Sequence, residues 1–490
     1  MQLLSCLLPT ALLATGVSAF YPYRVPKSPD SNPKPRFFPY RPATTYSNGE
    51  EDSHNGVTLD LVKHARAVRR DSQYHAEMGS EPTMENGLAI HTDGLDFAYF
   101  STVEFGSKNQ EMWMLLDTGA PNTWVMGSEC TVEACKMHNT FSEEDSTTLT
   151  TTDASWIVSY GTGEVRGVVI EDSMSFAGFV LQFPFGAAHW ASEEFKSYPM
   201  DGILGLGRSN ESFAGIPTVM EAIRQKKVLQ KNVLGINLQR SSDGHRDGQV
   251  ILGDIDKSKF EGDITYTNTV PDKSEWEIPL DNVIVGGEPI NLENKTAIID
   301  TGTSYILMPR DDANKIHALI SGSVPKGKSD FLVPCSADTT LEFVFSGQKF
   351  SISPKDYVGT ASGSDGMCNS NIVGKEVYGK DRWLVGATFI KNVYVIYDYD
   401  ESKIGFAKRK YLDIKPTQTA STTQSTSGPT LAPVPPKQNE EAKPETTPSS
   451  AEANEPPPSD PTGAASGLSI PMWLSIAFSL SASCSIGFTL

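Results

Sequence analysis

Two aspartates in this chain of 490 residues open the same triplet, Asp-Thr-Gly, at Asp117 and at Asp300. An apolar run precedes each copy, at residues 114–116 and 297–299. A carboxylate at the end of a buried strand costs free energy. Such a residue is therefore expected mainly where the chemistry of a site requires it. A following glycine allows close approach of the backbone. Two such carboxylates in one chain predict a pair that face each other.

Two carboxylates held close together cannot both ionise easily, so the pair retains one proton across the acid range. The ionised member can accept a proton from water, and the protonated member can donate one to a carbonyl oxygen. Such a pair can hydrolyse an amide bond by acid–base catalysis, without a covalent intermediate.

An apolar-apolar-Gly triplet follows each Asp-Thr-Gly triplet at nearly the same spacing. The apolar-apolar-Gly triplet that ends at Gly205 lies 88 residues after Asp117 (205 − 117). The matching triplet that ends at Gly386 lies 86 residues after Asp300 (386 − 300). A repeat of this length predicts two similar lobes related by a pseudo-dyad, with the carboxylates meeting at its axis.

Short runs rich in β-branched and aromatic residues recur between about residues 87 and 413, which predicts an all-β protein. Examples are residues 97–105, 165–170, 265–267, 341–345 and 393–397. Two helices are predicted, at residues 218–227 and 310–320. The second follows Pro309 and carries Asp311 and Asp312 in its first turn, which suits the helix dipole.

The motifs make the chain resemble the pepsin-like aspartic endopeptidases, and more closely their secreted, GPI-anchored fungal members. The resemblance covers about residues 96–408 and rests on Leu115–Gly119, Trp124-Val125, Tyr160–Gly163, Asp201–Gly207, Ile299–Ser304 and Trp383–Phe389. It implies a bilobal all-β fold with a few short helices, an N-terminal lobe at 93–270 and a C-terminal lobe at 271–413. It implies no cofactor and no metal.

The resemblance also implies roles for single residues. Asp117 and Asp300 would be the catalytic dyad that binds the attacking water. Flap and substrate contacts would come from Leu115, Gly119, Tyr160, Gly161, Thr162, Gly302 and Thr303, and support for the dyad from Thr118, Thr301 and Trp124. Tyr160 would lie on a mobile hairpin with its hydroxyl near the Trp124 indole. The plainer alternative for Tyr160 is a core tyrosine in an ordinary hairpin.

Two positions depart from common patterns of that family. Family members often carry Ser where this chain has Ala120, so Asp117 lacks a hydroxyl donor and the dyad should keep its proton to higher pH. Some fungal relatives carry Asp where this chain has Thr162. Glu164 lies nearby and is a candidate for selecting basic substrate residues, although a solvated flap charge is the simpler interpretation.

The N-terminal end predicts secretion. Residues 3–14 are mostly apolar and small residues follow at 17–19, so residues 1–19 are predicted to be a signal peptide, with a buried helix as the alternative. A pro-segment is predicted at 20–70, ending at the dibasic pair Arg69-Arg70, which is otherwise an exposed basic patch. One basic side chain among Lys34, Arg36, Arg41, Lys63 and Arg66 would cap the dyad in the zymogen. Residues 71–92 would extend the mature N-terminus.

The C-terminal end predicts an anchor. Residues 414–467 are rich in Ser, Thr and Pro and predict an extended, O-glycosylated stalk. The apolar tail, residues 468–490, has no basic residue after it and follows small residues, which is typical of a GPI signal attached at Gly463 or Ala464. A retained transmembrane helix is the alternative. The expected location is the outer face of the plasma membrane or the cell wall.

Other features agree with a secreted protein. Four cysteines remain once the signal and tail are removed, and proximity favours Cys130–Cys135 and Cys335–Cys368 among three possible pairings. N-glycosylation sequons begin at Asn210 and Asn294. The net charge of −19 argues against binding to nucleic acid.

We therefore expect a monomeric, secreted aspartic endopeptidase that acts on proteins and peptides at acidic pH, with a broad preference for hydrophobic residues beside the cleaved bond. The alternative is a catalytically silent, pepsin-like binding protein at the cell surface. The chain lacks Gly-x-Ser-x-Gly and His-Glu-x-x-His motifs, which disfavours serine and zinc hydrolases.

Overall fold

The structure is a computed structural model that describes residues 17–18, 74–161, 163–208 and 212–410. Most of the predicted signal peptide, the pro-segment with Arg69-Arg70, the stalk, the tail with Gly463 and Ala464, and both Thr162 and Asn210 lie outside these residues. The described residues all fall within one compact unit. Among the described residues, no helix is long and apolar enough to cross a bilayer.

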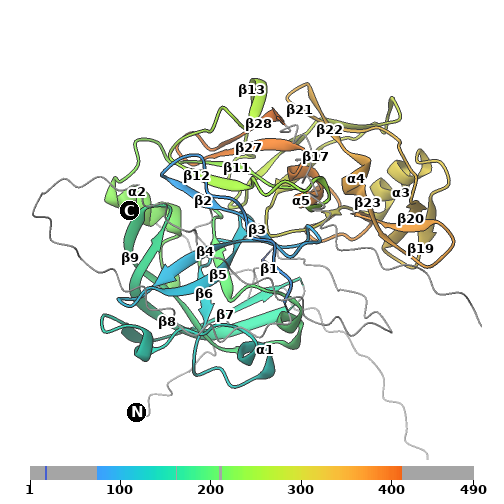
Figure 1. Cartoon of the computed structure of the whole chain (residues 1–490). Helices are drawn as coiled ribbons and strands as arrows, with labels where there is room; N and C mark the ends of the chain where they lie inside the picture. Colours follow the sequence, from blue (N-terminus) through green and yellow to red (C-terminus); the bar gives the residue numbers. More distant parts are fainter. Residues whose placement is uncertain (1–16, 19–73, 162, 209–211, 411–490) are drawn as a thin grey trace, which may run out of the picture. The chain divides into compact units, whose positions relative to one another are not determined.

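The N-terminal half is built on a sheet of nine strands in the order β1-β7-β8-β9-β6-β10-β5-β4-β3 (Figure 1). Its strands are β1 (Val17–Ser18), β3 (His91–Thr92), β4 (Tyr99–Phe105), β5 (Gln110–Asp117), β6 (Trp124–Met126), β7 (Thr150–Tyr160), β8 (Gly163–Phe176), β9 (Phe179–Ala191) and β10 (Gly202–Gly205). Strands β7 and β8 form a long hairpin whose turn follows Tyr160.

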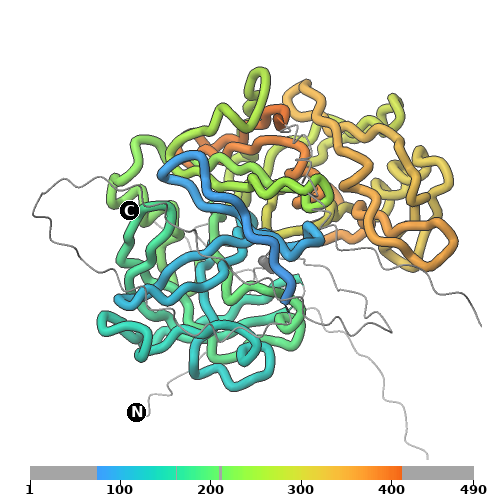
Figure 2. Tube along the Cα trace, in the orientation of Figure 1, coloured from blue at the N-terminus to red at the C-terminus, as the bar shows by residue number. Residues whose placement is uncertain are grey.

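A sheet of six strands joins segments from both halves of the sequence, in the order β13-β28-β27-β11-β12-β2. The strands are β2 (Gly87–Ala89), β11 (Val233–Asn237), β12 (Gln249–Leu252), β13 (Phe260–Asn268), β27 (Val393–Asp398) and β28 (Lys403–Arg409). Figure 2 shows the blue N-terminal segment of the described chain running beside the green segment that contains β12, its hydrogen-bonded partner.

The C-terminal half contains three smaller sheets. The first consists of β14 (Glu277–Leu280), β17 (Lys295–Ile299), β26 (Arg382–Val385), β18 (Ile306–Leu307) and β25 (Ile372–Val373). The second consists of β16 (Glu288–Pro289), β15 (Asn282–Val285), β21 (Leu341–Phe345) and β22 (Gln348–Ile352). The third consists of β19 (Val324–Lys326), β20 (Asp330–Pro334), β24 (Met367–Ser370) and β23 (Val358–Ala361). The predicted bilobal all-β class is confirmed.

Helices are few and short in the described part of the chain. The α-helices are α1 (Glu133–Lys136), α2 (Val219–Lys226), α3 (Arg310–Ala318), α4 (Pro354–Tyr357) and α5 (Ala387–Ile390), and the 3₁₀ turns are η1 (Glu143–Asp145), η2 (Glu193–Ser197), η3 (Phe213–Gly215) and η4 (Ser241–Asp243). Thr218 caps α2 by accepting from the N–H of Glu221. Helix α3 begins after Pro309 as predicted and ends two residues before the expected Ile320.

The spacing of the repeat has a structural cause. In the first half, β10 pairs in parallel with β5, and Gly205 lies opposite Asp117. In the second half, β26 pairs in parallel with β17, and Val385 lies opposite Ile299. A parallel pairing needs a long crossover, which accounts for the separation of nearly ninety residues. Each aspartate is therefore held at the end of a strand by its own apolar-apolar-Gly partner.

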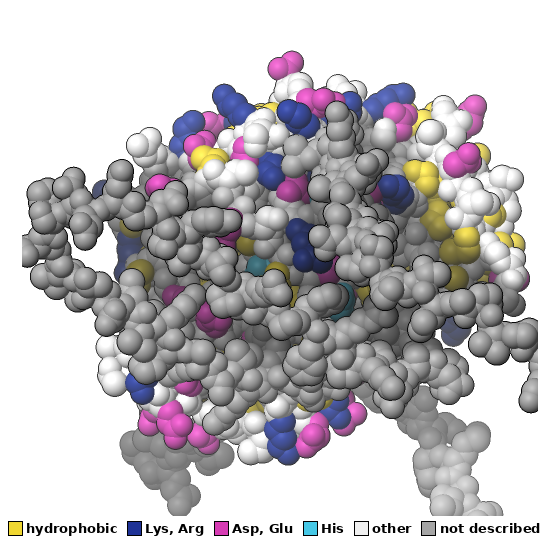
Figure 3. All heavy atoms as spheres, viewed as in Figure 1, with side chains coloured by type: hydrophobic (Ala, Val, Ile, Leu, Met, Phe, Trp, Pro, Cys, Tyr) yellow, Lys and Arg dark blue, Asp and Glu magenta, His cyan; other side chains and the backbone are white. Residues whose placement is uncertain are grey.

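Buried apolar side chains fix these strands. The largest cluster draws on both sequence halves and includes Phe105, Leu204, Leu234, Phe343 and Phe389. Charged side chains of both signs are interspersed on the visible described surface (Figure 3). Disulfides join Cys130 to Cys135 and Cys335 to Cys368, the two pairs that proximity favoured.

Candidate active site

The two aspartates lie at the ends of equivalent buried strands. Asp117 is the last residue of β5, and Asp300 directly follows β17. Both side chains are fully buried, with exposed fractions of 0%. Backbone bonds from Leu206 N to Asp117 O (2.7 Å) and from Asp300 N to Val385 O (3.0 Å) continue the parallel ladders to the carboxylates. The backbone ladders of the sheets therefore fix the position of each carboxylate.

The threonines of the two triplets join the halves of the site. The N–H of Thr118 donates to Oγ1 of Thr301 over 3.1 Å, and the N–H of Thr301 donates to Oγ1 of Thr118 over 3.0 Å. Each hydroxyl also donates to a carbonyl of the other half, from Thr118 to Ile299 O (3.2 Å) and from Thr301 to Leu116 O (2.7 Å). Because all these groups are buried, breaking one bond would leave an unsatisfied polar atom.

The glycines of the triplets serve the carboxylates in two ways. The N–H of Gly119 donates to Oδ1 of Asp117 over 2.9 Å, and the N–H of Gly302 donates to Oδ1 of Asp300 over 2.8 Å. A Cβ atom at Gly302 would lie 2.5 Å from Cγ of Asp117. Any larger residue at position 302 would therefore collide with the opposite carboxylate, a contact that the sequence did not predict.

The dyad is not symmetric. Oγ1 of Thr303 donates to Oδ2 of Asp300 over 2.5 Å. Ala120 stands at the same distance after Asp117, and Oδ2 of Asp117 is buried without a hydrogen-bond partner among the described residues. Burial and the charge of Asp300 raise the pKa of Asp117 well above its ordinary value. Burial also raises the pKa of Asp300, to about 6, against the opposing hydrogen bonds from Thr303 and Gly302.

The different surroundings of the two carboxylates favour different protonation states. Asp300 accepts hydrogen bonds from Gly302 and Thr303 that favour its ionised form, whereas Oδ2 of Asp117 is buried without a hydrogen-bond partner among the described residues. The pair is therefore expected to share one proton that resides mainly on Asp117. An ionised carboxylate beside a protonated one is the arrangement that activates water and polarises a carbonyl group.

The β7–β8 hairpin places Tyr160 next to this dyad. Tyr160 is buried, and its hydroxyl accepts a hydrogen bond from Nε1 of Trp124 over 2.7 Å. Burial and the charge of Asp117 raise the pKa of the Tyr160 phenol. Leu115, which precedes Asp117 by two residues, is buried in the same apolar cluster as Trp124 and Tyr160.

Glu164 on the same hairpin is already engaged. Its carboxylate lies 3.2 Å from the guanidinium of Arg166, and its N–H donates to Oγ of Ser192 over 3.0 Å. Arg166 in turn lies over the ring of Trp190 at 4.2 Å. A basic substrate side chain would have to compete with Arg166 for this carboxylate, which argues against Glu164 as a selector of basic residues.

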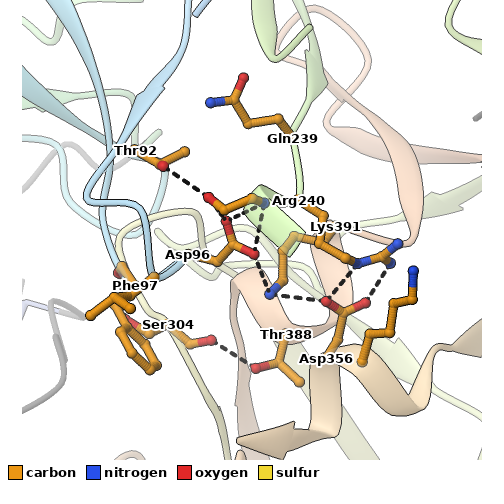
Figure 4. Close-up of polar contacts among 12 residues, drawn as sticks. Thr92, Asp96, Phe97, Gln239, Arg240, Ser304, Asp356, Thr388 and Lys391 are labelled. Atoms are coloured by element: carbon orange, nitrogen blue, oxygen red, sulfur yellow. Dashed lines mark hydrogen bonds and ion pairs between the residues drawn. The ribbon is translucent and has the colours of Figure 1, made fainter. Parts of the chain in front are cut away.

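A buried charge cluster joins Asp96, Arg240, Asp356 and Lys391 (Figure 4). Arg240 binds both carboxylate oxygens of Asp356, over 3.0 and 2.6 Å. Nζ of Lys391 lies 2.9 Å from Oδ1 of Asp356 and 3.5 Å from Oδ2 of Asp96. Burial raises the pKa of Asp356, but the charges of Lys391 and Arg240 outweigh it and hold the pKa below the ordinary value.

This cluster connects to the active-site loop through Phe97, the neighbour of Asp96. Oγ of Ser304 donates to the carbonyl of Phe97 over 2.6 Å, and Oγ1 of Thr388 donates to the carbonyl of Ser304 over 2.8 Å. Figure 4 shows these contacts side by side. Ser304 follows Thr303, so the cluster holds the segment that carries the Asp300 hydrogen-bond donor.

Sequence reasoning missed several residues that the structure brings to the site. The Tyr397 hydroxyl lies 3.2 Å from Oγ1 of Thr118 and 3.3 Å from the carbonyl of Ile299. The ring of Phe195 lies edge-on to Trp124, with ring centroids 5.7 Å apart, and to Tyr160, at 6.3 Å. Tyr397 falls in a predicted strand, but nothing in its pattern indicates a contact with a residue 279 positions away.

Other predicted sites lie away from the dyad or outside the description. Asn294 is exposed, with a positive φ of 52°, directly before β17. This loop position is accessible to a glycosylating enzyme, and modification there stays a prediction. Gly161 follows Tyr160 at the hairpin turn, while its neighbour Thr162 lies outside the described residues, as do Asn210 and the anchor residues. No group of three or more metal-ligating side chains occurs in the part of the chain described.

Comparisons with known proteins agree with this geometry. The family model described as "Eukaryotic aspartyl protease" matches residues 98–409. The chain is 46% identical to the "Probable aspartic-type endopeptidase CTSD" of Trichophyton verrucosum, covering 85% of this chain and 82% of that protein. It is 47% identical to the "Aspartic-type endopeptidase ctsD" of Aspergillus fumigatus, covering 86% and 90%. It is 31% identical to "Pepsin A" of Bos taurus, covering 64% and 84%.

Proposed function

Because the chain belongs to the eukaryotic aspartyl protease family and is an aspartic-type endopeptidase, we propose that it cleaves peptide bonds at acidic pH with water activated between Asp117 and Asp300. The proposal rests on one observation above the others. Two fully buried carboxylates, held by equivalent strands, contact each other at the junction of two threonine-linked halves. A like-charged pair is costly to bury without a shared proton.

The reaction needs no covalent intermediate. Ionised Asp300 takes a proton from water as the water oxygen attacks the carbonyl carbon of the substrate. Asp117 gives its proton to the carbonyl oxygen, which produces a tetrahedral gem-diol. Collapse returns one hydroxyl proton to Asp117 and breaks the C–N bond, while Asp300 protonates the leaving nitrogen. The products are a carboxylic acid and an amine, and the dyad regains its starting protonation.

The family resemblance implies which residues contact the substrate, and the geometry is compatible with it. Tyr160 and Gly161 would cover the bound peptide, and Thr303 would contact its main chain while it supports Asp300. The buried cluster of Leu115, Trp124 and Tyr160 favours apolar substrate side chains on that side of the cleaved bond. Protein substrates with hydrophobic residues beside the cleaved bond are therefore the expected class.

The predicted segments at both ends support a location outside the cell. A signal peptide, cleavage at Arg69-Arg70 and a GPI signal at Gly463 or Ala464 would make the protein a zymogen that matures during secretion and stays anchored at the surface. Release of activity from intact cells by a phosphatidylinositol-specific phospholipase would support the anchor. Retention of all activity after complete phospholipase digestion would contradict it.

Activity itself is tested with the dyad. Asp117→Asn and Asp300→Asn should each abolish hydrolysis of a peptide library between pH 3 and 7, because neither variant can both accept and donate a proton. Asp311→Asn, a change at an exposed aspartate of helix α3, is the matched control and should retain activity. A statine-type peptide should block the wild type because its hydroxyl replaces the attacking water. Undiminished hydrolysis by Asp300→Asn would refute the proposal.

A further inference from the structure

The segment before the first lobe is bound to the body of the protein along its length. Glu77 and Thr92 exchange backbone hydrogen bonds of 2.8 and 3.0 Å, and the N–H of Gly79 donates to Nδ1 of His91 over 2.9 Å. Further on, Oγ1 of Thr83 lies 3.1 Å from the amide oxygen of Gln249. Residues 74–86, which we call the N-terminal strap, are therefore hydrogen-bonded to the body of the protein. The first described residue of this strap is Tyr74.

Tyr74 reaches a part of the N-terminal half far from it in sequence. Its hydroxyl donates to the carbonyl of Lys196 over 2.8 Å, across 122 positions. Its ring stacks on the imidazole of His138, with ring centroids 5.3 Å apart and planes 28° apart. Tyr74 thus contacts both the 3₁₀ turn η2, which contains Lys196, and the segment that follows helix α1.

His138 also connects helix α1 to the end of η2. It is 2% exposed, its Nδ1 lies 2.5 Å from the carbonyl of Ala134 in α1, and its Nε2 lies 2.8 Å from the carbonyl of Tyr198. Tyr198 is the residue at the C-terminal end of η2. The Lys196 and Tyr198 carbonyls of this turn are therefore held by Tyr74 and His138.

The turn held in this way carries Phe195. Phe195 is 1% exposed, and its ring packs edge-on against Trp124 and Tyr160. Trp124 donates the hydrogen bond that fixes the Tyr160 hydroxyl. A continuous series of contacts thus leads from Tyr74, through the backbone of η2 and the ring of Phe195, to the tyrosine that faces the dyad.

We propose that Tyr74 and His138 are positioning residues for the endopeptidase reaction, clamping η2 so that Phe195 keeps Trp124 and Tyr160 in place. The inference rests on the proposed role of Tyr160 and gives the N-terminal strap a function of its own. The proposal also limits how far the N-terminus can be trimmed by proteolysis without loss of the clamp. Cleavage after Arg70 leaves Tyr74 as the fourth residue of the mature chain, whereas trimming past Tyr74 removes the clamp.

The test compares three variants of the full secreted chain. Tyr74→Ala removes the hydroxyl and the stacked ring, and should lower kcat/KM on an apolar peptide about tenfold because the flap tyrosine loses its fixed position. Tyr74→Phe keeps the ring and should lose no more than about threefold. Thr83→Ala loosens the same strap away from η2 and should change kcat/KM by less than about twofold. Melting temperatures establish that all three variants are folded.

A double-mutant cycle separates positioning from general stability. Tyr160→Phe removes the hydroxyl that Trp124 holds, so adding Tyr74→Ala in that background should cost less than about twofold. Full additivity of the two effects, or a Tyr74→Ala loss no larger than that of Thr83→Ala, would overturn the clamp. Neither result depends on whether Asp300→Asn abolishes hydrolysis, so failure of the clamp and failure of the proposed activity are distinguishable.

Discussion

The hydroxyl of Thr303 donates to Oδ2 of Asp300 over 2.5 Å. The corresponding position after the other aspartate is Ala120, which is fully buried and has no side-chain hydroxyl to donate. The two halves of the site thus share one backbone plan but differ in this side-chain hydrogen bond. Because a hydrogen bond to a carboxylate favours the ionised form, this difference separates the protonation of the two aspartates.

Supplying a hydroxyl at position 120 should shift the pH dependence of hydrolysis to lower pH. Ala120→Ser places a donor three residues after Asp117, as Thr303 stands three residues after Asp300, and so should lower the raised pKa of Asp117. The alkaline limb of the pH–rate profile should move to lower pH by about one unit. Ala120→Gly, which adds no hydroxyl, is the control and should leave that limb in place. An unchanged profile for Ala120→Ser would show that the hydroxyl does not reach Asp117.

Removing the existing hydroxyl should act on the other limb. Thr303→Val keeps the shape of the side chain but deletes the donor to Asp300, so the pKa of Asp300 should rise further. The acidic limb of the profile should then move to higher pH, because the base needed for water activation is protonated sooner. Thr303→Ser restores a hydroxyl and should restore the limb. A loss of rate at all pH values with no shift would contradict this assignment.

The dyad should also limit stability at neutral pH. A buried carboxylate pair whose pKa is raised in the folded state stabilises the fold most below its unfolded pKa, and this contribution is lost as pH rises through the raised folded value. Asp300→Asn should therefore raise the free energy of unfolding at pH 7 by roughly 1–3 kcal/mol relative to wild type, with little change at pH 3.5. Denaturant titrations at both pH values measure the difference. Equal effects at both would contradict the linkage.

The buried charge cluster should have the opposite dependence on pH. Asp356 has a lowered pKa, so its contribution is present above the unfolded pKa near 4 and is lost as pH falls through the lower folded value. Asp356→Asn leaves Arg240 and Lys391 buried without their shared partner and should cost about 3–5 kcal/mol at pH 6. Lys355→Gln, at an exposed partner of Asp243, should cost under about 1 kcal/mol. Similar costs for both would argue against the cluster's importance.

The two disulfides should differ in what they contribute. Cys335–Cys368 closes a sequence separation of 33, whereas Cys130–Cys135 closes a separation of 5. Chain-entropy reasoning gives about 4 kcal/mol for the longer loop and about 2 kcal/mol for the shorter one. Paired serine variants at each bridge, compared by denaturant unfolding, test this order. A larger cost at Cys130–Cys135 would indicate that strain or denatured-state structure outweighs loop length.

Much of the site was predictable because it is encoded in side chains at strand ends. Asp117 and Asp300 follow apolar runs, and the apolar-apolar-Gly marks turned out to be their parallel partner strands. The helices predicted at 218–227 and 310–320 are observed at 219–226 and 310–318, and Pro309 marks the start of the second one locally. Tyr160 and Trp124 were found only through resemblance, and their hydrogen bond has no signature of its own in the sequence.

The parts that escaped prediction share a physical cause. The partners of His138, Tyr74 and Ser304 are backbone carbonyls of Tyr198, Lys196 and Phe97. Every residue has a carbonyl, so no residue type marks such a partner. The buried cluster of Asp96, Arg240, Asp356 and Lys391 escaped for a different reason. Isolated charges in a sequence are most often solvated, and only the folded chain brings these four together.

The threonine bonds at the centre of the site have a consequence for how the enzyme comes into being. They join residues 181 to 185 positions apart, so they are contacts of very long range in the sequence. Contacts of this range form late, because the entropy of closing the intervening chain must be overcome first. A nascent chain cannot assemble the dyad until Asp300 has been synthesised. In refolding, recovery of hydrolysis should accordingly lag behind recovery of secondary structure.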